Sequence, residues 1–219
     1  MSTSTELKLA ILISGRGSNM TAIVRACLAG TISARPTMVI SDRADAAGLM
    51  SARELGVPTA AWTRDSGMTF ESWLTATLGA QQPDAIALAG FMRILSAPLV
   101  ETYLGRMLNI HPSLLPAYRG LHTHRRVLAA RDTEHGASVH FVTAELDGGP
   151  VVLQSKVAVE PGDTEAALMA RVQATEHVIY PRVLGWLGER RLAWRDGAAW
   201  LDGRRLDSPV VEDFRASSV

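Results

Sequence analysis

The first half of the chain alternates short apolar runs with segments whose apolar residues recur at helical spacing. Each run is short and is followed by turn or capping residues, which predicts buried strands at Leu9–Ile13, Thr37–Ser41, Val57–Trp62, Ala85–Ala89 and Met107–His111. Helices are predicted between them at Met20–Leu28 and Ala46–Leu55, then from Phe70 to a closing Gly79, with a short one capped by Ser96. This order predicts right-handed βαβ units. The fold class is therefore α/β, with a mostly parallel twisted sheet and helices on both faces.

The pattern changes after Pro112. The stretch Pro112–His124 holds two prolines, one glycine and two histidines, which predicts a long ordered loop. Ser138–Val142 and Val151–Val157 have the composition of strands.

A long helix and two turn signals end the chain. Asp163 is expected to cap a helix from about Thr164 to Trp186, which Pro181 should bend or split. The pairs Asp196-Gly197 and Asp202-Gly203 are the preferred residues of tight type I′ turns, so we expect a small C-terminal hairpin appendage.

Length and composition restrict the classes of function. A chain of 219 residues fits one domain, and we expect a single domain over 1–219, with halves at 1–111 and 112–190 and a tail at 191–219. The 22 basic and 22 acidic residues leave no basic excess, which argues against a nucleic-acid partner. No apolar run approaches the roughly 18–20 residues of a membrane span, and the start lacks the basic region of a signal peptide. One cysteine, Cys27, excludes an internal disulfide, so we expect a cytoplasmic protein.

A glycine loop, Ser14–Asn19, follows the first strand and precedes a helix. Glycines let the backbone approach a ligand closely, and the free N–H groups of a helix start favour an anion. Met20 stands where a dinucleotide fingerprint needs its third glycine, although Asp42 after the second strand keeps that reading open. The Lys-Ser/Thr pair of a Walker loop is absent. We therefore expect a single phosphate here, with a ligand-free tight turn as the alternative.

The strand Met107–His111 ends with two polar side chains, Asn109 and His111, on one face. Ligands of open α/β sheets gather at the carboxyl ends of the strands. An amide and an imidazole suit acyl transfer, because one donates a hydrogen bond to a developing oxyanion and the other moves a proton. Asp147, in the turn Leu146–Pro150, is a candidate carboxylate partner for His111. Taken singly, His111 also fits a satisfied strand-end residue, and Asp147 a turn former.

The sequence offers no evident nucleophile or metal signature. Cys27 lies on the apolar stripe of the first helix, which favours a core thiol, and no Gly-x-Ser-x-Gly motif is present. We expect the substrates to supply the nucleophile and the protein to supply positioning and proton transfer. His122, His124, His135 and His140 lie near one another in sequence, but not at the spacing of a zinc motif, so no metal is expected.

Several motifs together identify a resemblance. They are Ile13–Asn19, Leu88–Leu95, Leu108–Pro116, His140–Val142 and Glu145–Pro150. In this combination the chain resembles the phosphoribosylglycinamide formyltransferases (glycinamide ribonucleotide transformylases) of the formyltransferase superfamily, from about Leu9 to the tail at Trp200–Gly203. The Asn-x-His-Pro-Ser-Leu-Leu-Pro stretch is typical of the whole superfamily. The glycine loop and Met92–Leu95 narrow the resemblance to this one family.

The resemblance implies a one-carbon transferase of purine biosynthesis with a Rossmann-like formyltransferase fold. Such an enzyme moves a formyl group from 10-formyltetrahydrofolate to the amine of 5-phosphoribosylglycinamide. It does so by direct transfer through a tetrahedral intermediate, without a metal. The implied partners are these small molecules, with no nucleic acid or membrane, and the implied assembly is a monomer or homodimer.

Residue roles follow from the same match. Asn109 and His111 would stabilise and protonate the tetrahedral intermediate, and Asp147 would sustain the charge of His111. The matches to the substrate-binding residues are Gly17, Ser18 and Asn19 at the phosphate and Glu176 at the ribose. The matches to the cofactor-binding residues, mostly through backbone, are Met92, Arg93, Ile94, Leu95, Asn109, Thr143, Ala144 and Asp147. Ser138 matches a hydroxyl near the active-site water.

The chain departs from its relatives at one place. Close relatives often carry an arginine shortly before the aromatic residue that matches Phe70, where it reaches the folate tail. Here Ser66-Gly67-Met68 stands at that place, and Arg64 is a candidate substitute.

Three rival functions share the scaffold. A formyltetrahydrofolate hydrolase would use water as the acceptor and is expected to carry a regulatory domain before the first strand. A methionyl-tRNA formyltransferase is expected to carry a C-terminal RNA-binding domain and a basic surface. A non-catalytic folate or nucleotide sensor would be marked by loss of Asn109, His111 or Asp147, and all three residues are present.

Overall fold

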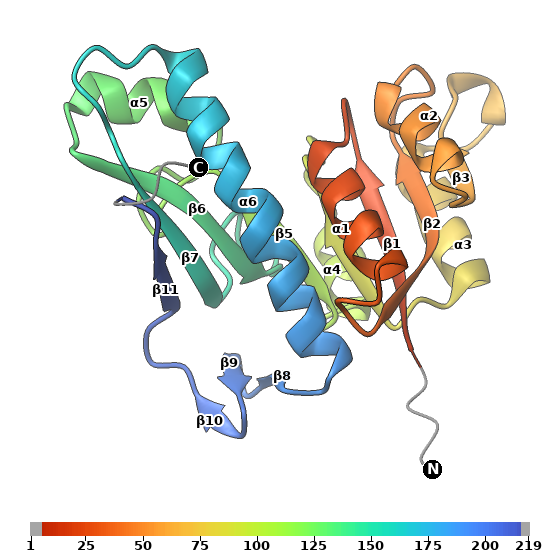
Figure 1. Ribbon diagram of the computed structural model, residues 1–219. Coiled ribbons are helices and arrows are strands. Elements are labelled where there is room, and N and C mark those ends of the chain that lie inside the picture. Colours follow the sequence, from red (N-terminus) through yellow and green to blue (C-terminus); the bar gives the residue numbers. More distant parts are fainter. Residues whose placement is uncertain (1–5, 216–219) are drawn as a thin grey trace.

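The first half of the chain folds as the predicted alternation of strands and helices (Figure 1). The computed structural model describes residues 6–215. The elements of this half are β1 (Leu7–Ile13), α1 (Ser18–Leu28), β2 (Ala34–Ser41), α2 (Ala47–Glu54), β3 (Thr59–Ala61), the 3₁₀ turn η1 (Arg64–Ser66), α3 (Phe70–Gln81), β4 (Ala85–Leu88), α4 (Ala97–Thr102) and β5 (Met107–His111). Every strand expected up to His111 is present, with ends that differ by up to three residues.

The second half adds two helices and the remaining strands. These are α5 (Thr123–Ala130), β6 (Glu134–Phe141), β7 (Val151–Ala158), α6 (Glu165–Gly188), β8 (Leu192–Arg195), β9 (Ala198–Leu201), β10 (Arg204–Arg205) and β11 (Val210–Asp213). Within residues 6–215, no helix combines the length and apolar character needed to cross a lipid bilayer.

Eight of the described strands form one sheet in the order β11-β7-β6-β5-β4-β1-β2-β3. The pairs among β1 to β5 are parallel, and β11 is parallel to β7. Only β6 runs against its two neighbours, so the mostly parallel sheet is confirmed. The antiparallel register places His140 of β6 opposite Asn109 of β5, and Ser138 opposite His111.

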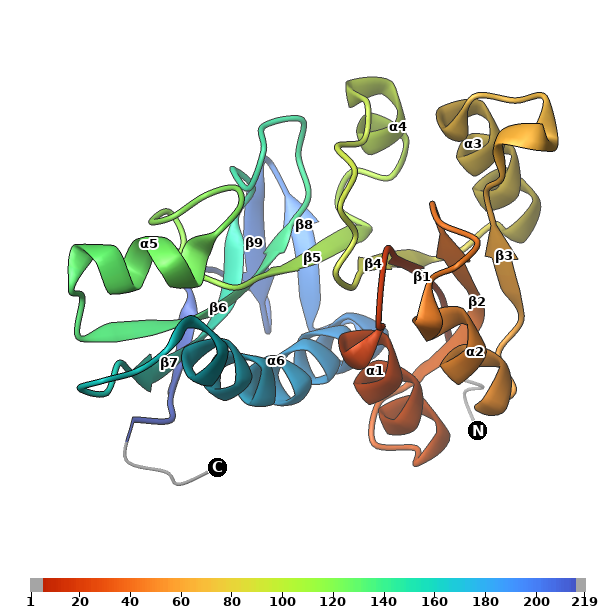
Figure 2. The same cartoon turned by 90° about the horizontal axis from the view of Figure 1, so that it is seen from above.

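Helices cover both faces of the sheet, as predicted. In Figure 2 α1, α2 and α6 lie below the sheet, and α3 and α4 lie above it. The helix α1 packs against both α2 and α6. The strands β1, β4 and β5 are almost wholly buried because both faces are covered, which explains why they are continuous apolar runs rather than alternating ones.

The C-terminal hairpins follow their turn chemistry. Asp196 and Gly197 have φ of +50° and +73°, and Asp202 and Gly203 have φ of +51° and +76°. Two successive residues with positive φ are what a type I′ turn requires, and these turns join β8, β9 and β10 into a small antiparallel sheet. One strand of the tail was not predicted: β11 follows this appendage and pairs with β7 at the edge of the main sheet.

Two expectations about helices were wrong, and two further features of the helices were not settled by the sequence. Gly79 does not close α3; the helix continues to Gln81, and Gln82 ends it in the left-handed conformation. Thr164, not Asp163, caps α6: its side chain accepts a hydrogen bond from the Ala167 amide, while Asp163 forms an ion pair with Arg171. The proline inside α6 does not split this helix of 24 residues. The helix α5 has no counterpart in the sequence prediction, and its first two residues, Thr123 and His124, lie within the stretch predicted as a loop.

Two glycines give opposite expectations for substitution by alanine. At Gly136 in β6 an added Cβ would lie 1.8 Å from the Ser155 carbonyl oxygen, whereas at Gly79 in α3 it would meet nothing within 4 Å. We predict that Gly136→Ala lowers the free energy of unfolding by more than about 2 kcal/mol, because the two strands must separate. Gly79→Ala should raise it by about 0.5–1 kcal/mol. Chemical denaturation of both variants checks this, and equal effects would contradict the packing described for β6 and β7.

Candidate active site

Two cavities open where β1, β4 and β5 end. The first, the glycine-loop cavity, has a volume of about 270 Å³. It is lined by Gly15, Arg16, Gly17, Ser18, Asn19, Ala89, Gly90, Met92, Ile110, Pro112, His124, Met169, Gln173 and Glu176. The second, the Phe91 cavity, has a volume of about 100 Å³. It is lined by Leu88, Phe91, Arg93, Ile94, Leu95, Val100, Asn109, His140, Val142, Thr143, Ala144, Glu145, Leu146 and Asp147.

The two cavities share a wall. Along the segment after β4, Gly90 and Met92 line the first cavity, while Phe91 and Arg93 line the second. Along β5, Asn109 lines the second cavity and the next residue, Ile110, lines the first. A group that crosses from one cavity to the other therefore passes the carboxyl end of β5, which carries the Asn109 amide and the His111 imidazole.

The structure brings Asn109, His111 and Asp147 together. His111 Nδ1 lies 3.5 Å from Asp147 Oδ2, and His140 Nε2 lies 3.8 Å from Asp147 Oδ1. Asn109 Nδ2 lies 3.1 Å from His140 Nε2, so the His140 ring lies between the amide and the carboxylate. The side chains of His111 and Asp147 are each 8% exposed. Two residues of β5, Asn109 and His111, thus form one polar network with His140 of β6 and with Asp147, which lies 36 residues after His111 in the chain.

His140 is the neutral imidazole of this network. Burial lowers its pKa to about 4, against the opposing effects of its hydrogen bond to Phe141 and of the Asp147 charge. Its Nδ1 lies 2.9 Å from the Phe141 carbonyl oxygen, which can only accept a hydrogen bond. The single ring proton is therefore on Nδ1, and Nε2 accepts a hydrogen bond from the Asn109 amide. This leaves the second Asn109 N–H free to bind another acceptor.

His111 is held at both ring nitrogens by oxygen acceptors. Its Nε2 lies 3.0 Å from the Tyr118 carbonyl oxygen, and its Nδ1 faces Asp147. Asp147 is fixed in turn, since its Oδ2 accepts a hydrogen bond of 2.9 Å from the Gly120 amide. The loop after β5 therefore supplies two backbone groups, the Tyr118 carbonyl and the Gly120 amide, to the two ends of the His111–Asp147 pair.

The turn that carries Asp147 depends on its glycines. Asp147 has a φ of +48°, a left-handed conformation that aspartate tolerates better than most residues. A Cβ on Gly149 would lie 1.9 Å from the Phe141 carbonyl oxygen, so only glycine lets the chain pass this close to β6. The Asp-Gly-Gly sequence thus places one carboxylate beside the end of the strand.

The glycine loop forms the start of α1, as predicted. Gly17 precedes the helix with a φ of +73°. The Gly48 amide at the start of α2 donates a hydrogen bond of 3.0 Å to the Gly15 carbonyl, which supports the loop from behind. The first N–H groups of α1 have no partner within the helix, and they lie in the wall of the glycine-loop cavity beside Ser18. The loop is therefore built to accept an anion.

Glu176 and Asn19 meet in the same cavity. Asn19 Nδ2 donates a hydrogen bond of 2.7 Å to Glu176 Oε2, and burial raises the pKa of Glu176. Asn19 Oδ1 is buried and has no hydrogen-bond partner among the described residues. A buried acceptor of this kind is costly unless a ligand satisfies it, so the wall of this cavity suits a ligand that carries hydroxyl donors.

Most of the other residues from the sequence prediction line the expected cavity. Arg93, Ile94, Leu95, Thr143 and Ala144 line the Phe91 cavity. Met92, which the resemblance groups with them, lines the glycine-loop cavity instead.

The structure places three side chains differently from what the sequence led us to expect. The Ser138 hydroxyl accepts hydrogen bonds from Leu115 N and Gln154 Nε2 and donates to the Ser113 carbonyl, so its only proton is already used. Asp42, the candidate ribose acid of a dinucleotide site, accepts a hydrogen bond of 2.9 Å from Arg93. Arg64 lines neither cavity, whereas Arg93 does, and its guanidinium lies 4.7 Å from the centre of the Phe70 ring.

Sequence reasoning missed the roles of His140 and Tyr118. The signal for His140 is its antiparallel pairing with Asn109, which appears only once β6 is known to run against β5. The contact of Tyr118 uses its backbone oxygen, which no side-chain pattern reveals. Among residues 6–215, no cluster of three or more His, Cys, Asp or Glu side chains is arranged to hold a metal ion.

Comparisons with known proteins agree on one family. The formyl transferase family model matches residues 7–184. The phosphoribosylglycinamide formyltransferase of Escherichia coli K12 is 52% identical over 203 residues, which cover 91% of this chain and 96% of that protein. The solved phosphoribosylglycinamide formyltransferase of Coxiella burnetii is 45% identical with a TM-score of 0.88, covering 94% of this chain and 98% of its own. A formyltetrahydrofolate deformylase of Pseudomonas syringae shares the fold, with a TM-score of 0.82 at 23% identity, and this chain covers 66% of it.

The buried histidines predict how stability depends on pH. Burial lowers the pKa of both His135 and His140 to about 4, whereas an unfolded histidine titrates near 6.5. Between those values the unfolded chain binds more protons than the folded one, so the free energy of unfolding falls as the pH falls from about 6.5 to 4. Each histidine contributes a slope of about 1 kcal/mol per pH unit in this window.

Urea denaturation at pH 7 and pH 5 measures the effect, and the protein should be less stable at pH 5. The variant His140→Asn keeps a donor for the Phe141 carbonyl but cannot titrate, so its stability should fall less between the two pH values. A variant with the same pH dependence as the original chain would show that His140 is not a buried neutral imidazole.

Proposed function

The chain belongs to the formyl transferase family, and from this we propose that it transfers a formyl group from 10-formyltetrahydrofolate to the amine of 5-phosphoribosylglycinamide. Both molecules are substrates, and the reaction is a step of purine biosynthesis. The observation that carries the proposal is the shared wall of the two cavities, where Asn109, His111 and Asp147 meet. A transfer between two small molecules needs two adjoining sites and catalytic groups at their boundary.

The glycine-loop cavity takes the phosphorylated acceptor. Gly17, Ser18 and Asn19 at the start of α1 bind the phosphate, since free N–H groups and the helix dipole favour an anion. Glu176 and the unpartnered Asn19 Oδ1 accept hydrogen bonds from the ribose hydroxyls. The amine of the acceptor then extends past Ile110 toward the end of β5.

The Phe91 cavity takes the folate. Its apolar walls suit the flat ring system, and the backbone of Arg93, Leu95 and Ala144 supplies hydrogen-bonding groups at the edges. Arg93 is held in place at the rim by Asp42 and stands over the Phe70 ring. In this proposal Arg93 takes the role of the arginine that close relatives carry where this chain has Gly67.

The reaction begins when the acceptor amine attacks the formyl carbon. A bond forms between the amine nitrogen and this carbon, and the formyl oxygen becomes an oxyanion. The free N–H of Asn109 and the Nδ1 side of His111 stabilise this oxyanion. Asn109 can do so because His140 accepts its other N–H and so fixes the orientation of the amide.

The intermediate collapses when the carbon–nitrogen bond to the folate breaks. The attacking nitrogen loses a proton and the folate nitrogen gains one, so the overall transfer is neutral. His111 moves this proton at Nδ1, while Asp147 compensates the charge of the imidazolium and the Tyr118 carbonyl holds Nε2–H. No part of the reaction requires a metal.

The single, unpaired cysteine fits a reducing compartment, so we place the reaction in the cytoplasm. We further propose that a monomer or homodimer carries it out.

The first prediction concerns the acceptor. Formyl release from the folate should require 5-phosphoribosylglycinamide, and the formyl group should appear on its amine. This separates the transferase from a hydrolase, which would release formate with water as the acceptor. Product analysis with and without the acceptor decides the question, and release at an equal rate in its absence would contradict the proposal.

The second prediction concerns the catalytic pair. His111→Ala and Asp147→Asn should each lower kcat by at least about 100-fold, because both remove charge stabilisation at the transition state. Equilibrium binding of both substrates should change little, since the walls of the two cavities remain. Asp207→Asn serves as the control, because its side chain is 89% exposed and lies in the C-terminal tail. Full activity in either active-site variant would refute the assigned roles.

A further inference from the structure

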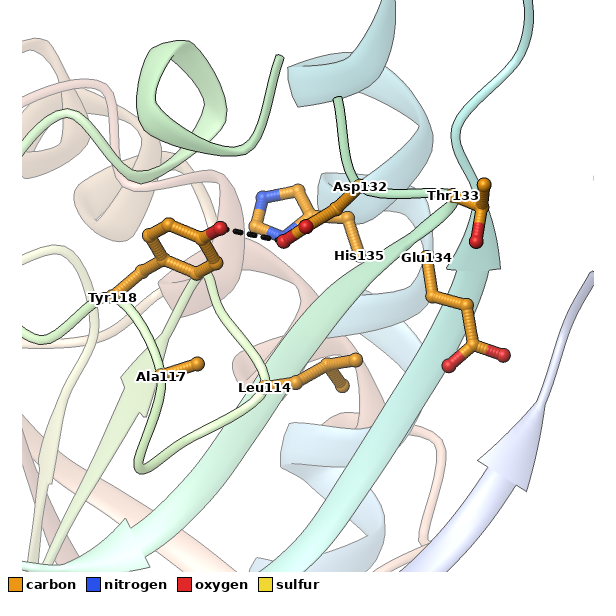
Figure 3. A pocket seen from close by; sticks show the side chains of 7 residues that line it. All are labelled: Leu114, Ala117, Tyr118, Asp132, Thr133, Glu134 and His135. Atoms are coloured by element: carbon orange, nitrogen blue, oxygen red, sulfur yellow. Dashed lines mark hydrogen bonds between the residues drawn. The ribbon is translucent and has the colours of Figure 1, made fainter. Parts of the chain in front are cut away.

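Tyr118 joins the catalytic histidine to a carboxylate outside both cavities. Its backbone carbonyl oxygen lies 3.0 Å from His111 Nε2. Its side chain points the other way, and the hydroxyl donates a hydrogen bond of 2.5 Å to Asp132 Oδ2, which Figure 3 shows. Asp132 comes directly after α5 and lines a separate cavity of about 300 Å³ with Glu134 and His135. Tyr118 thus contacts the catalytic histidine through its backbone and a residue of the outer cavity through its side chain.

We propose that Tyr118 and Asp132 are positioning residues, and that their hydrogen bond fixes the carbonyl oxygen that orients His111. The inference rests on the proposed function for its kinetic consequence only. Neither residue lines the glycine-loop cavity or the Phe91 cavity, so neither contacts a substrate bound there. Both act through His111.

The backbone at Tyr118 needs such an anchor. Its φ is +57°, in the left-handed region that non-glycine residues enter only when surrounding contacts hold them there. The Ser113 hydroxyl fixes the preceding residue by donating a hydrogen bond of 2.7 Å to the Ala117 carbonyl. After Tyr118, Arg126 donates a hydrogen bond of 2.6 Å to the Arg119 carbonyl. The Tyr118 side chain supplies the remaining restraint at the residue itself.

The anchor is itself rigid. Asp132 follows Arg131, which ends α5 in the left-handed conformation, and the Asp132 amide donates to the Val127 carbonyl inside the helix. The Arg126 guanidinium lies 5.2 Å from the centre of the Tyr118 ring and covers one face of it. The hydrogen bond to Asp132 also raises the pKa of the Tyr118 phenol, so the hydroxyl remains a donor at neutral pH.

Loss of the hydrogen bond should affect catalysis and not substrate binding. With the Tyr118 carbonyl free to turn, His111 keeps Asp147 as its one acceptor and loses the fixed position of its ring. Small displacements of a catalytic group slow the chemical step strongly, because the reacting atoms no longer meet in the required geometry. The bond lies beside an open cavity, so removal of the hydroxyl leaves no void in the core.

The test compares Tyr118→Phe, Asp132→Ala, the double variant and Asp132→Asn with the original chain. The first two should each lower kcat about tenfold, with KM for both substrates changed by less than about twofold. The double variant should be no slower than the slower single one, because both remove the same bond. Asp132→Asn retains an acceptor oxygen and should recover most of the activity.

Tyr103→Phe is the matched control. Tyr103 also carries a guanidinium, that of Arg106, at 5.0 Å over its ring, but it packs in the core on the other face of the sheet. This control should leave kcat unchanged. Unchanged kcat in Tyr118→Phe, multiplicative losses in the double variant, or losses confined to KM would each overturn the proposal.

A second readout does not depend on turnover. In the ligand-free protein the ¹⁵N and ¹H signals of the His111 ring should shift in Tyr118→Phe and Asp132→Ala and stay fixed in Tyr103→Phe. If the original chain transfers no formyl group, the proposed function fails, and these ring signals alone decide whether Tyr118 and Asp132 position His111. Unchanged His111 signals would then refute the positioning.

Discussion

The buried carboxylate of Asp147 is the group on which the arrangement of the site depends. A carboxylate that is 8% exposed is costly unless its charge is compensated. Here it faces the imidazole of His111 and accepts a hydrogen bond from the Gly120 amide, while the neutral ring of His140 lies 3.8 Å from its other oxygen. The partners come from β5, β6 and the loop after β5. Placing one acid therefore also fixes how these three segments sit around the ends of the strands.

The two imidazoles of the site have different roles, because burial keeps His140 neutral. His140 lies opposite Asn109 in the register of β5 and β6, and desolvation keeps it neutral, so it acts as an acceptor that orients an amide. His111 has oxygen acceptors at both nitrogens, and its Nδ1 lies 3.5 Å from the Asp147 carboxylate. One acid beside two histidines thus yields an oriented hydrogen-bond donor and a proton carrier. Acyl transfer needs both where an oxyanion forms.

Much of this architecture could be predicted from local sequence, and the rest depends on pairings that local sequence does not encode. The apolar runs and the Asp-Gly turns specify β1 to β5 and the C-terminal hairpins, because strand periodicity and positive φ are local properties. The pairing of β11 with β7 and the antiparallel direction of β6 join segments far apart along the chain. The glycine loop, Asn109, His111 and Asp147 could be found as motifs. His140 and Tyr118 could not, since one acts through strand register and the other through its backbone oxygen.

The most direct test of this account is a crystal structure of the protein with a stable analogue of the tetrahedral adduct spanning both cavities. The account predicts that the oxyanion of the analogue lies about 2.7–3.1 Å from Asn109 Nδ2 and within the same distance of His111 Nδ1. Asn109 should keep its hydrogen bond to His140, and Asp147 should remain beside His111. An oxyanion that faces solvent, or a His111 ring turned away from it, would contradict the claim that these groups meet around the reacting carbon.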